Sequence, residues 1–232
     1  MTDSDGAKTT GAGGRPAPIV FEGVTKTYGD VDALRDVDLR IEPGEFRCLV
    51  GPNGSGKSTL FDLLLGLQRP TAGTVSAPRD AVGCSFQRPT VYPDLSVAEN
   101  LRVFANLAGT DDAWVETLVV RFALDAVRDR VVRTLSGGFT QRLDLALAVV
   151  GRPAYVVVDE PFTDLDAPAR ERLVDFLEEY RTGDRSVLVS THEVEAFGPS
   201  VDRFTVLDDG AVAFDGAADA ATAVDALENR MG

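Results

Sequence analysis

The segment Gly51-Pro52-Asn53-Gly54-Ser55-Gly56-Lys57-Ser58-Thr59 decides the fold, because its pattern is that of a phosphate-binding loop. Its glycines let backbone N–H groups turn inward towards phosphate oxygens, Lys57 can reach the β- and γ-phosphates, and the Ser58 hydroxyl can bind Mg²⁺. Residues 46–50 before the loop predict a buried strand, and residues 60–66 after it predict a helix whose N-terminus attracts anions. The alternative is a glycine-rich turn without a ligand. The strand, loop and helix together favour a site for a nucleoside triphosphate.

The length and composition indicate one globular α/β domain. The chain has 232 residues, of which 44% are hydrophobic and 26% charged, as in ordinary globular proteins. No apolar run approaches the ~18 residues that span a bilayer. Residues 1–18 are polar and rich in Gly and Pro, so we expect a disordered leader there. Cys48 and Cys84 lack metal-ligand spacing and are expected to be free, buried thiols.

The net charge is strongly negative. The 37 acidic and 23 basic residues give −14, and only Lys8, Lys26 and Lys57 are lysines. The acidic residues are scattered, so they predict a solvated surface rather than an interaction tail. Such a surface repels itself in dilute salt, and at ~1 M salt a Debye length of ~3 Å removes most of that repulsion. We therefore predict a salt-loving host, with a merely acidic protein as the alternative. The charge also argues against binding to nucleic acid.

Periodicity predicts strands and helices along most of the chain. Residues 37–41 alternate between apolar and polar, which indicates a half-exposed antiparallel strand. Ser96 and Glu99 form a capping-box pattern before an apolar helical face. The pattern predicts an antiparallel β segment, a mostly parallel core sheet and a helical insertion at about 88–150. The expected strands are 19–22, 37–41, 46–50, 81–86, 154–158, 186–190, 204–207 and 211–214, and the expected helices after the insertion begins are 97 onward, 111–122, 139–150, 167–181 and 217 onward.

A second chemical motif follows the predicted buried strand 154–158. The strand ends in Asp159 and Glu160, and the carboxyl ends of parallel strands face the crevice where ligands bind. Asp159 is suited to hold Mg²⁺, and Glu160 can accept a proton from the attacking water. A pair of acidic residues after a strand is a weak signal alone. Together with the phosphate loop it predicts nucleotide hydrolysis.

The segment Leu135-Ser136-Gly137-Gly138 adds a family resemblance. With the phosphate loop and Asp159-Glu160 it resembles the nucleotide-binding subunits of ATP-binding cassette (ABC) transporters, from about Ile19 to Phe214. The resemblance implies a single α/β ATPase domain over 19–232, with a P-loop NTPase core, an N-terminal antiparallel β subdomain and an inserted α-helical subdomain. It also implies that two subunits pair head to tail, so that residues 135–138 of one close on the ATP of the other.

The same resemblance assigns further residues. Tyr28 resembles the aromatic residue that stacks on adenine, and Gln87 resembles the glutamine that contacts Mg²⁺ and the γ-phosphate. His192, the only histidine, resembles the switch residue at the γ-phosphate. Leu165 and Asp166 resemble the loop that couples the two ATP sites. The implied catalytic set is therefore Lys57, Gln87, Glu160 and His192, and the implied Mg²⁺ ligands are Ser58, Gln87 and Asp159.

Two positions depart from the family pattern. Phe139 stands where the family usually has Gln, and Gln141 follows two positions later. Asp164 adds an acid where the family often has a small residue. Neither change removes a group that hydrolysis needs.

The resemblance implies an ATPase subunit that drives transport through a separate membrane permease, from the cytoplasmic face of the cell membrane. Its partners would be the permease and a second ATPase subunit, identical or different, and its ligands ATP and Mg²⁺. Residues 92–101 resemble subunits of exporters that pair with six-span permeases of the ABC-2 type. The alternatives are a soluble ATP-driven clamp and a nucleotide-binding regulator without turnover. A clamp would be expected to carry a coiled coil or a basic surface, and a regulator to lack Glu160 or His192.

Overall fold

The structure is a computed structural model that describes residues 15–193, 196–197 and 200–217. Its strands and helices cover most of that range. The strands are β1 (Ile19–Tyr28), β2 (Val31–Ile41), β3 (Phe46–Val50), β4 (Ala72–Ser76), β5 (Val82–Ser85), β6 (Tyr155–Asp159), β7 (Ser186–Ser190), β8 (Arg203–Asp208) and β9 (Ala211–Gly216). The helices are α1 (Lys57–Leu65), α2 (Val97–Ala108), α3 (Asp112–Arg121), α4 (Gly137–Val149) and α5 (Ala167–Tyr180), with short 3-10 turns at Arg79–Ala81, Asp125–Val127 and Val132–Thr134.

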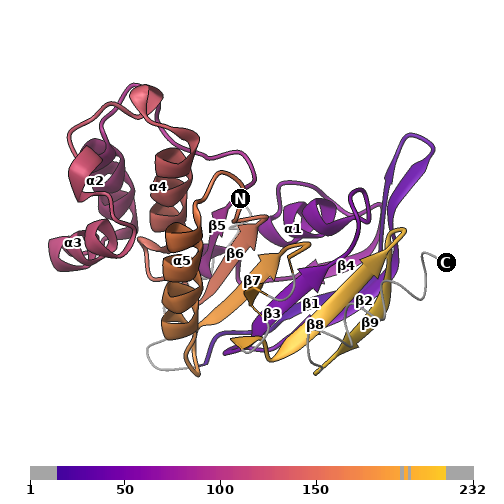
Figure 1. Cartoon of the computed structure of the whole chain (residues 1–232). Coiled ribbons are helices and arrows are strands. Elements are labelled where there is room, and N and C mark those ends of the chain that lie inside the picture. Colours follow the sequence, from indigo (N-terminus) through magenta and orange to yellow (C-terminus); the bar gives the residue numbers. More distant parts are fainter. Residues whose placement is uncertain (1–14, 194–195, 198–199, 218–232) are drawn as a thin grey trace, which may run out of the picture.

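The strands form two sheets. The larger has the order β5-β6-β7-β3-β8-β9 and is parallel except for the last pair, β8 and β9. The smaller is antiparallel with the order β2-β1-β4. Figure 1 shows α2, α3 and α4 grouped at one end of the molecule, with α4 above α5, and the smaller sheet towards the other end. The α/β fold predicted from the sequence is confirmed.

Strand β6 shows how the core is divided. Its side chains alternate between the two faces of the sheet, as in any strand. Tyr155 and Val157 belong to an apolar cluster with α1 and the smaller sheet, whereas Val156 and Val158 belong to a cluster with helices α2 to α5. Both faces of β6 are therefore covered, which explains why its sequence is an unbroken apolar run.

The capping box predicted at Ser96 is present at the start of α2. The Glu99 backbone N–H donates to Ser96 Oγ at 3.2 Å, and the Ser96 N–H donates to Glu99 Oε2 at 2.7 Å. Gly109 ends the helix with a φ of 66°, a left-handed conformation that glycine adopts without strain. Together these residues fix both ends of α2.

Several boundaries differ from the sequence prediction. Strand β1 runs to Tyr28 rather than ending at residue 22, and β4 was not expected. Helices α1 and α4 begin earlier, at Lys57 and Gly137. The helix predicted from residue 217 onward lies almost entirely outside the described residues.

The predicted disordered leader is described only from residue 15. Arg15 Nη2 donates to Pro43 O at 2.6 Å, and the Tyr155 hydroxyl donates to Ala17 O at 2.8 Å. The end of the leader therefore contacts the core. None of the helices in the described part of the chain is long and apolar enough to cross a membrane.

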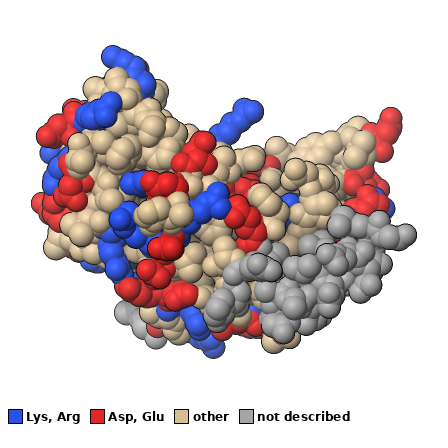
Figure 2. Space-filling model, in the orientation of Figure 1, with Lys and Arg blue, Asp and Glu red and all other residues tan. Residues whose placement is uncertain are grey.

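The charged side chains are mixed on the visible face. Figure 2 shows acidic residues spread over it among basic ones rather than gathered into a single block. This distribution agrees with the scattered acids of the sequence.

Candidate functional site

The phosphate loop joins β3 to α1, and its backbone requires glycine at two positions. Gly56 has a φ of 104°, and a Cβ added there would lie 2.5 Å from Ala33 O. A Cβ added to Gly51 would lie 2.3 Å from Leu207 O. Any larger residue would therefore collide with backbone, so the loop keeps this shape only with glycine.

Lys57 folds back onto its own loop. Its Nζ donates to Gly51 O at 2.8 Å and to Pro52 O at 3.1 Å. Burial lowers the pKa of Lys57, while the nearby carboxylates of Glu160 and Asp159 act in the opposite direction. The ammonium group is thus held at the loop with protein oxygens as its partners, where a phosphate could replace them.

The Asp159 carboxylate, at the carboxyl end of β6, accepts hydrogen bonds from hydroxyl groups on two other elements. Ser58 Oγ at the start of α1 donates to Asp159 Oδ2 at 3.0 Å, and Ser190 Oγ at the end of β7 donates to Asp159 Oδ1. The side chain of Asp159 is buried, and hydrogen bonds to a charged group are the stronger kind. The carboxylate is therefore fixed beside the phosphate loop.

Ser190 was not predicted from the sequence. Besides its bond to Asp159, its Oγ and carbonyl oxygen each accept from the Glu160 backbone N–H at 3.1 Å. The parallel pairing places Asp159 directly opposite Ser190. The signal in the sequence is a serine at the end of a predicted strand. It points to Asp159 only when the order of the strands in the sheet is known.

The side chains of Glu160 and His192 lie next to each other. Glu160 has a φ of 48°, the left-handed region that is uncommon for a residue other than glycine. His192 Nδ1 lies 2.9 Å from Glu160 Oε2, and the His192 side chain is 71% exposed. The pair presents a carboxylate whose position a neighbouring imidazole can hold, as a general base requires.

The phosphate loop, Asp159 and Glu160 line one cavity of about 350 Å³. It is open to solvent and mainly polar, and it joins the phosphate loop to the ends of β5 and β6. The lining residues are Ala33, Asn53, Gly54, Gly56, Lys57, Ser58, Thr59, Gln87, Asp159 and Glu160. The predicted loop, Gln87 and the paired carboxylates are therefore brought together, and Ala33 is an addition from β2.

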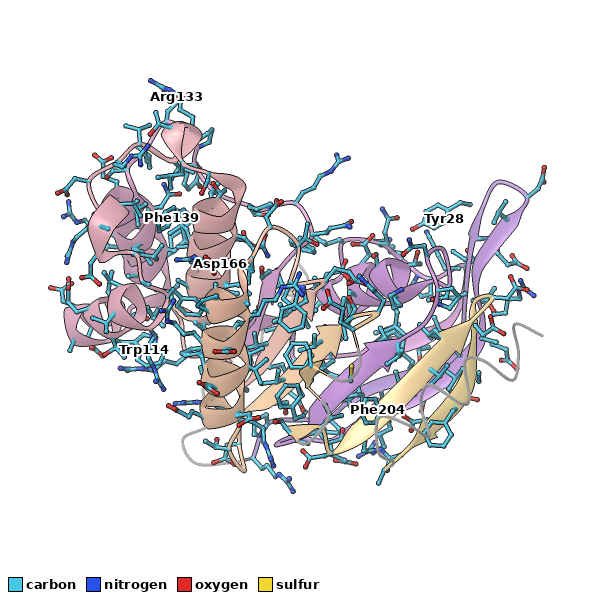
Figure 3. The ribbon with its side chains drawn as sticks, in the orientation of Figure 1. Tyr28, Trp114, Arg133, Phe139, Asp166 and Phe204 are labelled. Carbon is cyan, nitrogen blue, oxygen red and sulfur yellow. The ribbon has the colours of Figure 1, made fainter. Side chains whose placement is uncertain are left out.

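Tyr28 does not line this cavity. It ends β1 with 44% of its surface exposed, and Lys26 Nζ lies 4.8 Å from the centre of its ring. Figure 3 shows Tyr28 near the β1–β2 hairpin, on the side of the molecule away from Phe139 and Asp166.

The segment 135–138 also lies apart from the cavity. Ser136 is the N-cap of α4, and its side chain makes no capping hydrogen bond. Phe139, in the first turn, is half-buried with the Arg142 guanidinium 4.9 Å from its ring centre. One chain therefore does not bring its own segment 135–138 to its own phosphate loop.

Leu165 and Asp166 lie where the chain turns from β6 into α5. Leu165 is buried, and Asp166 Oδ1 accepts from the Ala169 backbone N–H at 2.9 Å as the N-cap of α5. Arg142 Nη2 lies 3.4 Å from the same carboxylate. Asp166 thus connects α4 to the start of α5.

Comparisons with known proteins agree on one family. The ABC transporter family profile matches residues 34–163. The chain is 37% identical over 216 residues to "Nod factor export ATP-binding protein I" of Burkholderia orbicola, covering 87% of this chain and 71% of that protein. It is 38% identical over 203 residues to "Aliphatic sulfonates import ATP-binding protein SsuB 1" of Nocardia farcinica, covering 86% and 82%.

Solved structures show the same similarity. The dimeric bacterial ABC transporter cassette MJ0796 matches with a TM-score of 0.77 and 27% identity, over 86% of this chain and 98% of that one. A post-hydrolysis dimer of the same cassette, bound to ADP and Pi, matches with a TM-score of 0.77 and 26% identity, over the same shares of the two chains.

Proposed function

Because the chain belongs to the ABC transporter family and is an ATP-binding subunit that hydrolyses ATP, we propose that it works as one of two ATPase subunits that power a separate membrane permease. The observation that carries the proposal is the single cavity in which the phosphate loop, Gln87, Asp159 and Glu160 meet.

Within that cavity we assign each residue a role from its position. The loop N–H groups and Lys57 bind the β- and γ-phosphates, because Lys57 can exchange its bonds to Gly51 O and Pro52 O for phosphate oxygens. Glu160 accepts the proton of the attacking water, and His192, 2.9 Å from its carboxylate, positions it. Tyr28 stacks on the adenine ring.

The donor set beside the phosphates fits Mg²⁺. Ser58 and Asp159 offer hard oxygen ligands already in contact at 3.0 Å, and Gln87 lines the same cavity. The described residues contain no cluster of three or more His, Cys, Asp or Glu side chains that could hold a metal alone. This suits Mg²⁺, which uses few protein ligands and takes the rest from phosphate and water. Bound there, Mg²⁺ would neutralise charge on the phosphates.

A second subunit would give the segment Leu135-Ser136-Gly137-Gly138 a function. Its N–H groups begin α4 and form an anion-binding helix end, yet it lies outside its own chain's cavity. We propose that it closes on the ATP of a second subunit in a head-to-tail pair, and that Leu165 and Asp166 couple the two sites. The dimeric form of the similar cassette supports this pairing.

The permease would hold the subunit at the cytoplasmic face of the membrane. A cytoplasmic helix of the permease would dock between Gln87 and the helical insertion. Export, expected from residues 92–101, stays a prediction, because the relatives' names include both an exporter and an importer.

Two measurements test the proposal. The Glu160→Gln variant should bind ATP normally but turn over at least ~10²-fold more slowly, because the attacking water loses its proton acceptor. Near-normal hydrolysis would mean that another group is the base. Affinity capture of the tagged chain from detergent-solubilised host membranes should retain a multi-span protein, identified by mass spectrometry. Retention of soluble proteins alone would contradict the role in transport.

A further inference from the structure

Asp164 packs directly on the two glycines that begin α4. A Cβ added to Gly137 would lie 2.8 Å from Asp164 Oδ2, and one added to Gly138 would lie 2.7 Å from Asp164 O. Both the carboxylate and the backbone of Asp164 therefore touch the segment to which the proposed function assigns the partner's ATP.

The position of this carboxylate is constrained by the backbone. Asp164 has a φ of 64°, in the left-handed region, and its carbonyl oxygen faces Gly138. Leu165, the next residue, is buried and its N–H donates to Phe162 O at 3.2 Å. Asp164 cannot move far from the glycines without disturbing this turn.

The charge of Asp164 is not neutralised within the described part of the chain. Its carboxylate forms no ion pair there, in contrast to Asp166, which caps α5 and lies 3.4 Å from Arg142 Nη2. Asp164 is also exposed. The carboxylate therefore stands beside Gly137 without a counter-ion among the described residues, at the helix end to which the proposed function assigns the partner's ATP.

We propose that Asp164 sets the ATP affinity and the salt requirement of subunit pairing by repelling the partner's triphosphate. The inference rests on the head-to-tail pairing proposed above. In this pair Asp164 opposes closure. At low ionic strength its repulsion keeps the two subunits apart, and at high salt the repulsion is screened and the subunits close.

The size of the effect follows from Coulomb's law. A carboxylate about 8 Å from two negative charges in water raises the ATP concentration needed for pairing roughly fivefold. That figure holds without salt. At 0.1 M salt the Debye length of ~10 Å reduces the repulsion at this separation by about half, which leaves a roughly twofold effect, whereas above 1 M a Debye length below ~3 Å removes nearly all of it.

The test uses the Glu160→Gln background, in which ATP persists. Asp164→Asn keeps the side-chain shape, and asparagine tolerates a positive φ. Asp184→Asn is the matched control, because it makes the same charge change at an exposed residue in the turn after α5. Asp164 precedes this helix of 14 residues and Asp184 follows it, so the two residues are separated by its length of ~20 Å. Sedimentation velocity with Mg²⁺ and increasing ATP gives the half-saturating ATP concentration for dimer formation at 0.1 and 2 M KCl.

We expect Asp164→Asn to lower that concentration roughly twofold at 0.1 M KCl and to leave it nearly unchanged at 2 M. Asp184→Asn should follow the parent at both salt concentrations. Equal shifts in the two variants, or none in Asp164→Asn, would overturn the inference while leaving the pairing intact. Absence of an ATP-dependent dimer in every variant would instead refute the proposed pairing, and the inference with it.

Discussion

Ser190 bonds the Asp159 carboxylate and the Glu160 backbone N–H at the ATP site, so its removal should slow turnover as well as lower stability. In Ser190→Ala, Asp159 loses the hydroxyl that donates to its carboxylate. The Glu160 N–H loses the Ser190 hydroxyl as an acceptor but keeps its bond to the backbone oxygen of residue 190 at 3.1 Å. A hydrogen bond to a charged group contributes about 1.5–3 kcal/mol. We therefore expect Ser190→Ala to lower the free energy of unfolding by this amount.

The control lies on the same strand. Ser186 begins β7, is as buried as Ser190, and accepts from the Gly44 N–H at 2.8 Å, far from the cavity. Ser186→Ala leaves that N–H unpaired and should cost about 1–3 kcal/mol of stability, a similar amount.

Turnover separates the two variants. With Asp159 held by Ser58 alone and Glu160 less constrained, we expect kcat of Ser190→Ala to fall about tenfold, the equivalent of about 1.4 kcal/mol in the barrier. Ser186→Ala should keep kcat within about twofold. Urea unfolding and steady-state ATP hydrolysis measure the two quantities. If both variants lose activity equally, or if Ser190→Ala keeps the parent kcat, the positioning role is wrong.

Three further outcomes are expected. Lys57→Ala should lose tight ATP binding, since no other cation lines the cavity among the described residues; unchanged affinity by calorimetry would contradict the phosphate-loop assignment. The urea midpoint should rise between 0.1 and 2 M KCl, because salt screens the repulsion of a −14 chain; a constant midpoint would argue against a salt-loving host. Burial raises the pKa of Cys48 to about 12 and that of Cys84 to about 11, so both should resist iodoacetamide at pH 8 until urea unfolds the chain. Rapid labelling of folded protein, followed by mass spectrometry, would show that the thiols are accessible.

The parts of the site that were predicted from the sequence are those encoded in short contiguous segments. The phosphate loop needs its glycines locally, and the apolar run of β6 ending in Asp159 follows from burial on both faces. Ser190 was missed because its role depends on the pairing of β6 with β7, which no local pattern specifies.

The same reason explains the missed strand β4. Its residues Ala72–Ser76 are small or polar and mostly exposed, so alone they resemble a loop. Pairing with β1 makes them a strand, through partners such as Phe21 and Val75. Likewise the contact of Asp164 with Gly137 joins two loops that are separated by α4 and β6, and only the fold brings them together.

The position of β3 in the large sheet has a consequence for how the chain acquires its fold. This strand leads into the phosphate loop, and its two neighbours are β7 and β8, both near the other end of the chain. The β1–β2 hairpin can form as soon as its residues are synthesised, but β3 must wait until β7 and β8 have left the ribosome. Such long-range pairings form late and slowly, because loop-closure entropy is lost before the contacts form. The nucleotide-binding end of the sheet is therefore among the last parts of the chain to be completed.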